Sequence, residues 1–425
     1  MIPKSDRIPD WQDKLVYAKL DKPARSVGNV IAVLMYHPEW RKKIRLNRWT
    51  GEIEIHGQLP WQDMDMDANG PTWTDEDSIL LQTWMGNEVH PSFIVGRDTV
   101  YDAVIVVAKA NGYDPVIDWM SSLKWDGVHR LDSWTQTYLG AEDTDAHRLA
   151  GKWWLISAVA RAFQPGCPAQ HMLVLEGPQG IGKSTALKTL GGDWFTDTPF
   201  AIGDKDSYMT IAGSLIVEFA ELSSVRRSKD VESVKSFITQ AEDKFRAPYG
   251  RVVKTVKRRC VLAGSVNDSQ YLSDPSGNRR FWPVKCTSVD VDGLRRMREQ
   301  LFAEAVSEYR AGTKWFPENN AQREIMREQQ AQRTHRDAWI DPIEKWISEL
   351  RRDAIPSADP DALTIPDVLA GGLKIEHKRD WDRAAQMRVA DCLRELGYDR
   401  HQIREGAIRK WVYRPSPPPE PGTSG

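Results

Sequence analysis

Residues 171–185, HMLVLEGPQGIGKST, decide the fold of this chain. The run HMLVLE is short and apolar, as expected of a parallel strand that is buried on both faces. Residues 177–184, GPQGIGKS, match the pattern GxxxxGK[ST] in full, and a helical run over residues 184–190 follows at once. A strand, a glycine-rich loop and a helix in this order predict a loop that cradles phosphate groups.

The loop has the residue types that ATP and magnesium need. Glycines let the loop fold around the anion so that backbone N–H groups and the helix N-terminus face it, while Lys183 neutralises the β- and γ-phosphates. The hydroxyl of Ser184 is expected to hold Mg²⁺. The expected nucleotide-binding residues are Gly177, Pro178, Gln179, Gly180, Ile181, Gly182, Lys183, Ser184 and Thr185. The alternative, a glycine-rich turn that binds nothing, is disfavoured by the flanking strand and helix.

Two more short apolar runs follow, LIVEF at residues 215–219 and CVLAGS at residues 260–265. The three runs alternate with helical segments, which predicts an open α/β sheet of parallel strands. Just before them, residues 146–163 fit a largely buried helix. After Pro283 the chain is helical and charged through residue 336, as expected of a lid or a linker.

Hydrolysis also needs groups that hold magnesium from a second strand and orient water. Glu218 lies within LIVEF, where a buried charge needs a partner or a metal. Glu221 follows near the strand's carboxyl end, where active sites of open α/β sheets lie. Asn267 ends the third strand and is a candidate to orient water or sense the γ-phosphate. The alternatives are a Glu218 that faces solvent from an edge strand and an Asn267 that only forms a turn.

Residues 278–283, NRRFWP, put two guanidinium groups beside what is expected to be a rigid aromatic-proline corner. Arg279 or Arg280 is a candidate arginine finger, because such a mount suits a charge that must reach a phosphate. If the finger acts on the ATP of a neighbouring subunit, the protein is an oligomer. The alternative is an ordinary surface ion pair.

A basic stretch at residues 244–259, KFRAPYGRVVKTVKRR, is expected to form a strand, a turn and a second strand. Lys and Arg contacts to phosphates supply sequence-independent affinity for nucleic acid, and an aromatic side chain can stack on a base. The candidate nucleic-acid contacts here are Arg246, Tyr249, Arg251, Lys254 and Lys257. The alternative is a solvated hairpin without a ligand.

Near the C-terminus, Met387, Ala390, Leu393 and Leu396 recur at helical spacing, and residues 403–413 predict a hairpin about residues 405–406. A helix followed by a hairpin indicates a winged-helix-like domain. Its arginines and lysine suit contacts with the DNA backbone, and docking to a protein is the equal alternative. The residues concerned are Arg400, Arg404, Arg409 and Lys410.

The expected organisation has four parts: an N-terminal mixed α/β or helical module (1–134), a P-loop ATPase domain resembling AAA+ proteins (135–336), a winged-helix-like domain (337–414) and a disordered tail (415–425). Within the N-terminal module, residues 27–36 predict a strand or short helix, residues 63–77 an acidic loop, and residues 97–111 a helix.

Composition sets further bounds on the class of protein. The 425 residues have a formal net charge of −2, so contacts with nucleic acid must come from local basic patches. The four cysteines lie far apart without CxxC spacing, which argues against a zinc site and against a disulfide framework. We expect a soluble, cytoplasmic protein, since no run of about eighteen apolar residues occurs. The 18 tryptophans are expected to pack in cores.

Several motifs together resemble the virulence-associated protein E family. They are NGYDPVIDWMSSLKWDGVHRLDSWTQTYLG at residues 111–140 and then, in order, AVARAFQPG, VLEGPQGIGKST, EFAEL, FRAPYG and GNRRFWPV. The resemblance covers roughly residues 111–284. That family occurs on phages, prophages and genomic islands. It is similar to the superfamily 3 helicases of the AAA+ class, which form rings and move along DNA during replication initiation.

The resemblance implies roles for individual residues. It makes residues 177–185 the Walker A loop, Asn267 the first sensor, and residues 246–257 a hairpin that faces the pore of a ring. It makes Glu218 and Glu221 the Walker B acids and Arg279 or Arg280 the finger. One departure matters: Walker B strands usually end in Asp and an adjacent acid, whereas here two residues separate the two glutamates. Which glutamate binds magnesium therefore stays open.

Three functions fit the sequence. The first is an oligomeric, nucleic-acid-dependent ATPase, a helicase or replication initiator with DNA and replication proteins as partners. The second is a P-loop phosphotransferase that acts on a small molecule. The third is an ATP-gated interaction protein of a mobile element without motor activity. Paired arginines after a sensor-like Asn favour the first over the second, and the sequence does not separate the first from the third.

Overall fold

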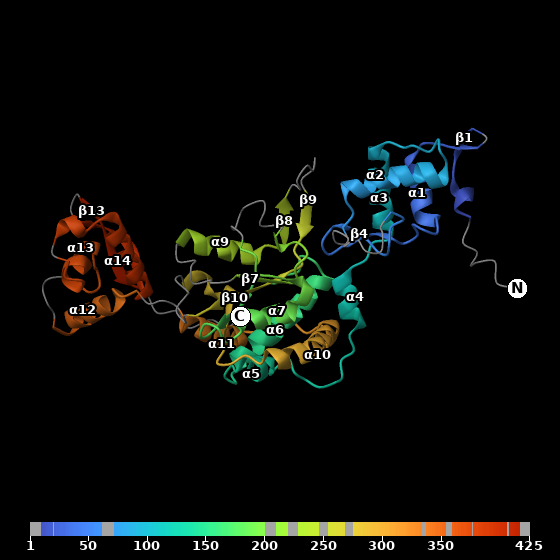
Figure 1. Cartoon of the computed structure of the whole chain (residues 1–425). Coiled ribbons are helices and arrows are strands. Elements are labelled where there is room, and N and C mark those ends of the chain that lie inside the picture. The colour runs from blue at the N-terminus through green and yellow to red at the C-terminus, as the bar shows by residue number, and fades with distance from the viewer. Residues whose placement is uncertain are drawn as a thin grey trace, which may run out of the picture. The chain divides into compact units, whose positions relative to one another are not determined.

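The computed structural model describes residues 10–19, 21–61, 72–199, 210–219, 228–245, 254–267, 275–333, 337–353, 359–375, 377–405 and 408–416. The chain divides into two compact units, residues 1–333 and residues 334–425 (Figure 1). The first unit contains an N-terminal module and a sheet domain, and the second unit is a smaller body of helices with one hairpin.

A five-stranded sheet forms the centre of the sheet domain. Its order is β11-β5-β10-β7-β6, and each strand pairs in parallel with its neighbours. The strands are β5 (Met172–Glu176), β6 (Phe195–Thr196), β7 (Ile216–Phe219), β10 (Val261–Val266) and β11 (Phe281–Lys285). The predicted α/β sheet with parallel strands is thus confirmed, and β10 lies between the glycine-loop strand β5 and the acidic strand β7.

Two of these strands were missed by the sequence pattern. The segment containing Pro283 was expected to be a corner, but it forms strand β11 on the edge of the sheet. Proline lacks an N–H group and is tolerated there, because an edge strand pairs on one side only. Strand β6 has only 2 residues, too short for a recognisable pattern.

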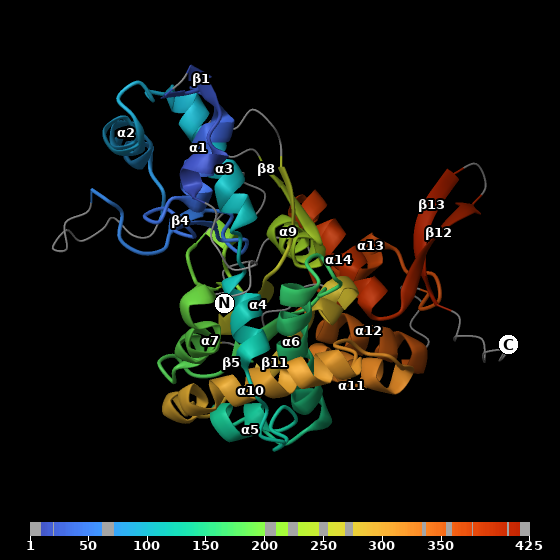
Figure 2. The same cartoon turned by 90° about the vertical axis from the view of Figure 1, so that its right-hand side faces the viewer.

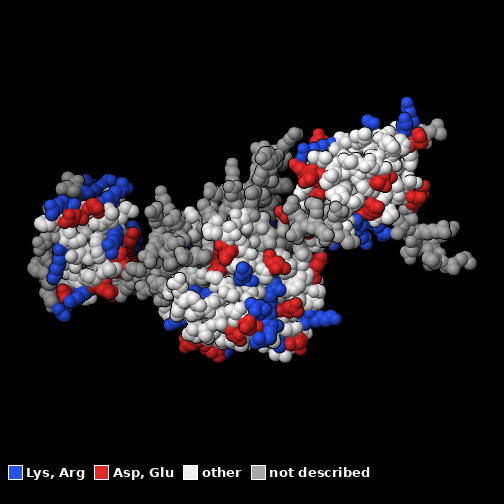
Figure 3. Space-filling model, viewed as in Figure 1, with Lys and Arg blue, Asp and Glu red and all other residues white. Residues whose placement is uncertain are grey.

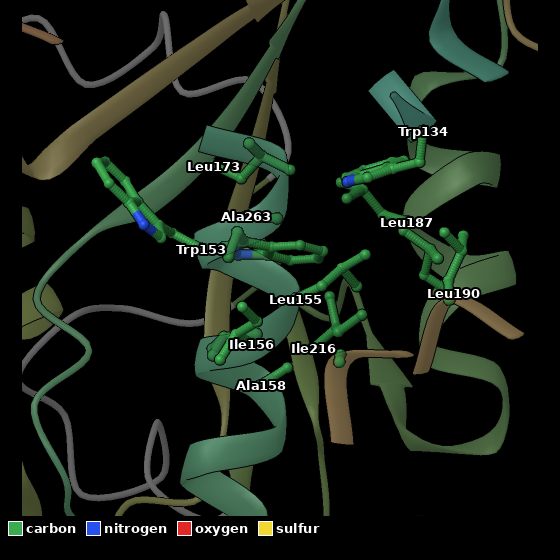
Figure 4. Close-up of a cluster of buried hydrophobic side chains, with 14 of the residues drawn as sticks. Trp134, Trp153, Leu155, Ile156, Ala158, Leu173, Leu187, Leu190, Ile216 and Ala263 are labelled. Atoms are coloured by element: carbon green, nitrogen blue, oxygen red, sulfur yellow. The ribbon is translucent and has the colours of Figure 1, made fainter. Parts of the chain in front are cut away.

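Alternation along the strands divides the sheet into two buried faces. Leu173, Leu175 and Ile216 face a core shared with α6 (Asp145–Phe163), α7 (Lys183–Gly191) and α10 (Val291–Ala311) (Figures 2 and 4). Met172, Val174 and Val217 face the opposite side, where α9 (Ser228–Thr239) contributes Val234, Phe237 and Ile238. The buried helix predicted over residues 146–163 is confirmed as α6.

Helix α10 is part of the core and not a lid or a linker, which corrects the expectation for the chain after Pro283. Its side chains Leu294, Leu301 and Phe302 are buried in the same cluster as α6 and the sheet. Helix α11 (Asn320–Ala331) follows and buries Met326 there. Most of the charged side chains on these helices are exposed, with Glu304 a buried exception, and they hid an apolar stripe at helical spacing.

The N-terminal module has its own hydrophobic core, formed around α1, α2 and α3. Residues 27–36 form helix α1, and the helix predicted over residues 97–111 is confirmed as α3. The acidic segment is corrected in part: residues 62–71 lie outside the described residues, and residues 75–77 form the first turn of α2, capped by Thr74. The elements are η1 (Trp11–Lys14), β1 (Tyr17–Lys19), β2 (Lys22–Pro23), α1 (Val27–Tyr36), β3 (Ile44–Leu46), β4 (Ile53–Ile55), α2 (Asp75–Trp84), η2 (Met85–Val89) and α3 (Arg97–Ala110).

The segment that joins the module to the sheet domain packs in the core of the sheet domain. Helices α4 (Pro115–Ser122) and α5 (Trp134–Leu139) bring Val116, Met120 and Trp134 into that cluster. Arg259, just before β10, ties the two parts together: it forms an ion pair with Asp114 at 2.6 Å and lies 4.1 Å from the centre of the Trp49 ring.

An antiparallel hairpin joins the sheet domain at β8 (Glu242–Phe245) and β9 (Lys254–Lys257), as the basic stretch predicted. Its base is fixed by a buried ion pair between Arg258 and Asp243 at 2.5 Å. Arg258 also lies 4.1 Å from the centre of the Phe237 ring of α9. The turn of the hairpin, residues 246–253, lies outside the described residues.

The C-terminal unit consists of helices packed beside a second hairpin. Its elements are α12 (Ile340–Asp353), α13 (Ile365–Asp367), η6 (Val368–Gly372), η7 (Lys378–Asp380), α14 (Arg383–Glu395), β12 (Tyr398–Glu405) and β13 (Ile408–Pro415). The predicted helix and hairpin are both present, and the hairpin extends further on both sides than residues 403–413. The assignment as a winged helix stays a prediction.

All four cysteines are buried, and each has a free thiol. Among the described residues, no helix is both long enough and apolar enough to span a bilayer.

Candidate nucleotide site at the carboxyl edge of the sheet

The glycine-rich loop connects β5 to α7 with backbone angles that side chains disfavour. Gly177, Gly180 and Gly182 have φ angles of 149°, 83° and 98°. A Cβ atom on Gly177 would lie 2.4 Å from the carbonyl oxygen of Cys286, so a larger residue does not fit there. The glycines are needed for this path, which leads from the end of β5 into the first turn of α7.

Lys183 is held across the loop at the start of α7. Its Nζ donates to the carbonyl oxygens of Gly177 at 2.7 Å and Pro178 at 2.8 Å, and to Oδ1 of Asn267 at 3.1 Å. The side chain is buried, and this burial lowers the pKa of Lys183. Three neutral oxygens thus hold the ammonium group inside the loop. A negatively charged oxygen is a stronger acceptor and is able to replace them as its partner.

Glu218 and Ser184 meet although they come from different elements. Alternation along β7 puts Glu218 on the same face as Ile216, the face that packs against α7. The hydroxyl of Ser184 donates to Oε1 of Glu218 at 2.6 Å. Glu218 is only 2% exposed and lies on a strand between β10 and β6, so it is not the solvent-facing edge residue of the alternative interpretation.

Asn267 lies between these groups because β10 separates β5 from β7. It directly follows β10, is exposed, and accepts the hydrogen bond from Lys183. The structure therefore brings together three predicted site residues from three strand ends: Lys183 after β5, Glu218 in β7 and Asn267 after β10. Glu221 lies outside the described residues.

A buried ion pair beside the loop was missed by the sequence pattern. Glu176 is the last residue of β5, and its Oε1 accepts a hydrogen bond from Nε of Arg333 at 2.7 Å. Both residues are buried, and Arg333 also donates to the backbone oxygen and Oε1 of Gln329. The signal was present in HMLVLE, because a charge that ends a buried strand needs a partner just as Glu218 does.

A hollow of about 870 Å³ lies beside α7. It is lined by Trp119, Thr185, Lys188, Thr189, Gly192, Asp193, Trp194, Arg295 and Arg298. Arg298 is fixed there, since it donates to the carbonyl oxygen of Leu190 at 2.8 Å and lies 4.2 Å from the centre of the Trp119 ring. Thr185, the last residue of the predicted phosphate loop, opens onto this space, which is large enough for a group of nucleoside size.

The two candidate finger arginines lie at the amino ends of the strands, whereas the loop lies at the carboxyl ends. Arg279 and Arg280 end the short helix η5 (Pro275–Arg280), immediately before β11. Phe281 pairs with Met172 at the start of β5, whereas Lys285 pairs with Glu176 beside the loop. At about 3.3 Å per residue, the length of β11 puts roughly 16 Å between the arginines and the loop of the same chain. Arg279 is exposed and Arg280 is half-buried.

The candidate nucleic-acid contacts of the first hairpin are described only in part. Arg246, Tyr249 and Arg251 lie outside the described residues. Lys254 and Lys257 are in strand β9, and Lys257 is exposed. In the C-terminal unit, Arg404 and Arg409 are exposed and pair across the hairpin.

One cluster of metal-ligand residue types occurs among the described residues, and it contains none of the predicted site residues. Ligand atoms of His129, Glu304 and Glu308 lie within 4.8 Å of one another. Glu304 already accepts from His129 and from the backbone N–H groups of Arg130 and Leu131, at 3.0, 2.7 and 3.0 Å. These three hydrogen bonds offset the cost of burying the Glu304 carboxylate. They also anchor residues 129–131 to α10.

Comparisons with known proteins place this site in a family context. A family model described as the virulence-associated protein E-like domain matches residues 120–335. Among solved structures, the apo structure of the NrS-1 C-terminal region is 11% identical, with a TM-score of 0.42, and the match covers 88% of this chain and 96% of that chain. Its A form is similar at 11% identity, with a TM-score of 0.39 and coverage of 87% and 96%. No curated protein matches the sequence.

Proposed function

The chain belongs to the family of virulence-associated protein E-like domains, and on this premise we propose that it is a nucleic-acid-dependent ATPase of a phage or other mobile element. Its role would be that of a DNA helicase or replication initiator, which moves along DNA as it hydrolyses ATP. The fold proposed for the sheet domain is that of AAA+ proteins, and the C-terminal unit is proposed as a winged-helix-like domain. The domain limits proposed are residues 1–134, 135–336 and 337–414, with residues 415–425 as a tail.

The observation that carries this proposal is the contact between Ser184 and Glu218. Two residues selected independently as magnesium ligands, one after a glycine loop and one in a separate strand, meet at 2.6 Å. An ordinary glycine-rich turn gives no reason for a buried carboxylate to reach its first helical turn. A phosphate loop does, because the cation bound to ATP is held from both sides.

These residues fit magnesium by their chemistry. Mg²⁺ takes oxygen ligands and is bound by one or two carboxylates together with phosphate oxygens. Ser184 and Glu218 both supply oxygen, and Oε2 of Glu218 is buried without a hydrogen-bond partner among the described residues. When bound, magnesium would neutralise charge on the β- and γ-phosphates. We assign metal binding to Ser184 and Glu218, and leave to Glu221 the activation of water.

The remaining residues act on the triphosphate by position and charge. Lys183 would exchange its carbonyl partners for phosphate oxygens, since a charge-assisted hydrogen bond is stronger than one to a neutral oxygen. Residues 177–185 would hold the phosphates through backbone N–H groups. Asn267, which touches Lys183, is in reach of the same space and would orient water or sense the γ-phosphate.

The arginines support an oligomer. Because Arg279 and Arg280 lie at the amino end of β11, away from the loop of their own chain, they would serve the ATP of a neighbouring subunit. We therefore propose a homo-oligomer, a ring, in which one of these arginines is the finger. The hairpin β8–β9 would contact single-stranded or forked DNA through Arg246, Tyr249, Arg251, Lys254 and Lys257. A cytoplasmic location and contacts with replication proteins are proposed with it.

ATP turnover with and without DNA tests this function. Wild-type protein with ATP and Mg²⁺ should hydrolyse ATP faster when single-stranded or forked DNA is added. Lys183→Ala should abolish turnover, because the charge that neutralises the phosphates is lost. Lys314→Ala, an exposed lysine of the same unit, is the matched control and should behave as wild type.

Mass measurement in the presence of ATP separates the competing functions. The motor predicts an oligomer together with DNA-stimulated turnover. A phosphotransferase predicts phosphate on a small acceptor and no oligomer, and a gated interaction protein predicts slow turnover that ignores DNA. Turnover indifferent to DNA, with no DNA bound by the purified protein, would contradict the proposed function.

A further inference from the structure

The second hairpin separates its charges onto two faces. Residues that pair directly across an antiparallel ladder share a face, and neighbours along a strand alternate. The pairs Arg400–Tyr413, Gln402–Trp411 and Arg404–Arg409 therefore share one face, called here the arginine face. The pairs Asp399–Arg414, His401–Val412 and Ile403–Lys410 share the other face. Among the side chains described, the arginine face has no carboxylate.

The arginine face is open to solvent in its outer part. Arg400, Arg404 and Arg409 are exposed, and Trp411 is 48% exposed. The guanidinium carbon of Arg400 lies 4.0 Å from the centre of the Trp411 ring, so a cation already covers one side of the indole. Trp411 is thus an exception to the expectation that the tryptophans pack in cores.

The inner part of the same face holds the hairpin in place. Tyr398 and Tyr413 are buried in the core of the C-terminal unit, together with helix residues such as Leu393. The backbone of Tyr413 also bonds that of Leu363 in both directions, at 2.7 and 3.0 Å. Beyond this anchor the strands project past the helices (Figure 2). The exposed arginines and tryptophan therefore stand on a fixed support.

We propose that the outer arginine face binds single-stranded DNA, with Trp411 stacking on a base and Arg400, Arg404 and Arg409 contacting the phosphates. This rests on the proposed function and deepens it, since it names a second DNA surface and an aromatic contact. Arginines and an exposed aromatic ring on one face suit a strand whose bases are unstacked. An acidic protein segment would also pair with the arginines, but it would not explain why an indole ring is exposed beside them. Figure 3 shows Lys and Arg side chains at the end of this unit where Figure 1 labels β13.

The register assigns a testable difference to two adjacent basic residues. Arg409 is on the arginine face, whereas Lys410 pairs with Ile403 on the other face and is half-buried. If the hairpin were a uniform basic patch, both residues would contribute alike to binding. The arginine face predicts that Arg409 contacts the bound strand, as Arg404 opposite it does, and that Lys410 does not, although the sequence made Lys410 a candidate contact.

Binding of fluorescently labelled oligothymidine to the full chain, measured by anisotropy without nucleotide, tests the proposal. Trp411→Ala should weaken binding about fivefold or more, the loss expected from one stacked base. Trp411→Phe should restore most of it. The double variant Arg404→Ala, Arg409→Ala should weaken binding and lower the slope of log affinity against log salt by about 0.7 for each phosphate that is no longer neutralised.

Lys410→Ala is the matched control, and it should change affinity less than twofold. An abasic strand of the same length separates stacking from charge: on it, Trp411→Ala should bind as wild type does. If Lys410→Ala and Arg409→Ala lose equal affinity, or if Trp411→Ala binds oligothymidine as wild type does, the proposal is wrong. Equal competition by polyglutamate, with no effect of Trp411→Ala, would indicate an acidic protein partner instead.

These outcomes do not depend on ATP hydrolysis. Lys183→Ala should keep the arginine-face binding while it loses turnover. If the wild-type chain fails to hydrolyse ATP and its DNA binding still depends on Trp411, the proposed motor fails and the binding surface stands. If turnover is stimulated by DNA and the hairpin variants bind normally, the motor stands and the surface fails.

Discussion

The ends of β5 and β7 each carry a buried glutamate, and the two carboxylates meet different partners. Glu176, at the end of β5, forms an ion pair with Arg333 at 2.7 Å. Glu218, in β7, accepts from the neutral hydroxyl of Ser184 at 2.6 Å. Both glutamates are 2% exposed, and each has a second oxygen, Oε2, that is buried without a hydrogen-bond partner among the described residues. The difference between the two regions is therefore the charge of the partner.

This difference separates a structural carboxylate from one suited to a ligand. A buried charge is tolerated when an opposite charge and hydrogen bonds offset its desolvation. Arg333 supplies that charge to Glu176, so the start of the glycine loop has a permanent anchor. Glu218 has only a hydroxyl on its bonded oxygen, which leaves room for a cation to complete the environment of the carboxylate.

The largest expected effect comes from removing the permanent partner. Arg333→Ala should lower the free energy of unfolding by about 3–5 kcal/mol, because the carboxylate of Glu176 is then buried without its counter-charge. Denaturant titration measures this change. Arg327→Ala, on the same helix and in an exposed pair with Glu324, should cost at most about 1 kcal/mol. Equal costs for the two variants would show that Glu176 does not need the guanidinium.

The next effect falls on the other glutamate and on turnover. Glu218→Gln keeps the shape of the side chain and removes its charge, so ATP hydrolysis should fall about 100-fold, the scale of removing one electrostatic interaction from a catalytic site. Steady-state turnover at saturating ATP and Mg²⁺ measures it, and Glu299→Gln, an exposed glutamate of α10, is the control. Normal turnover of Glu218→Gln would remove this residue from the site and shift the metal to Glu221.

Local patterns were enough to predict the loop and its neighbours. The loop residues lie in one continuous segment, and Glu218 and Asn267 each follow from one apolar run, because parallel strands bring their carboxyl ends to one edge. Alternation along LIVEF then decides which face Glu218 takes. The roles of these residues in ATP binding and hydrolysis stay predictions.

Other features depend on distant parts of the chain and had no local pattern. Glu176 and Arg333 are separated by 157 positions, and nothing near Arg333 indicates which strand it reaches. The residues around Pro283 predict a corner and not a strand, because the order of all the strands decides whether a proline lies at an edge. Parallel pairing of β11 with β5 sets Arg279 and Arg280 at the amino ends of these strands, away from the loop at the carboxyl ends, which is why a neighbouring subunit enters the proposal.

The smallest effect tests the comparison most directly. The same Glu→Gln substitution should lower the free energy of unfolding at one strand end and not at the other. Glu176→Gln should lower the free energy of unfolding by about 1–3 kcal/mol, because Arg333 then has only neutral acceptors and no counter-charge in a buried site. Glu218→Gln should leave it unchanged or raise it by about 1 kcal/mol, because a neutral amide replaces a buried carboxylate that no described cation contacts directly. Both are measured by denaturant titration without nucleotide or divalent cation.

Addition of a non-hydrolysable ATP analogue and Mg²⁺ should then stabilise the wild type more than Glu218→Gln, because a ligand that binds only the folded state adds more to the free energy of unfolding when it binds more tightly. A loss of stability in Glu218→Gln equal to that in Glu176→Gln would mean that both carboxylates are structural, and the distinction between the two strand ends would be lost.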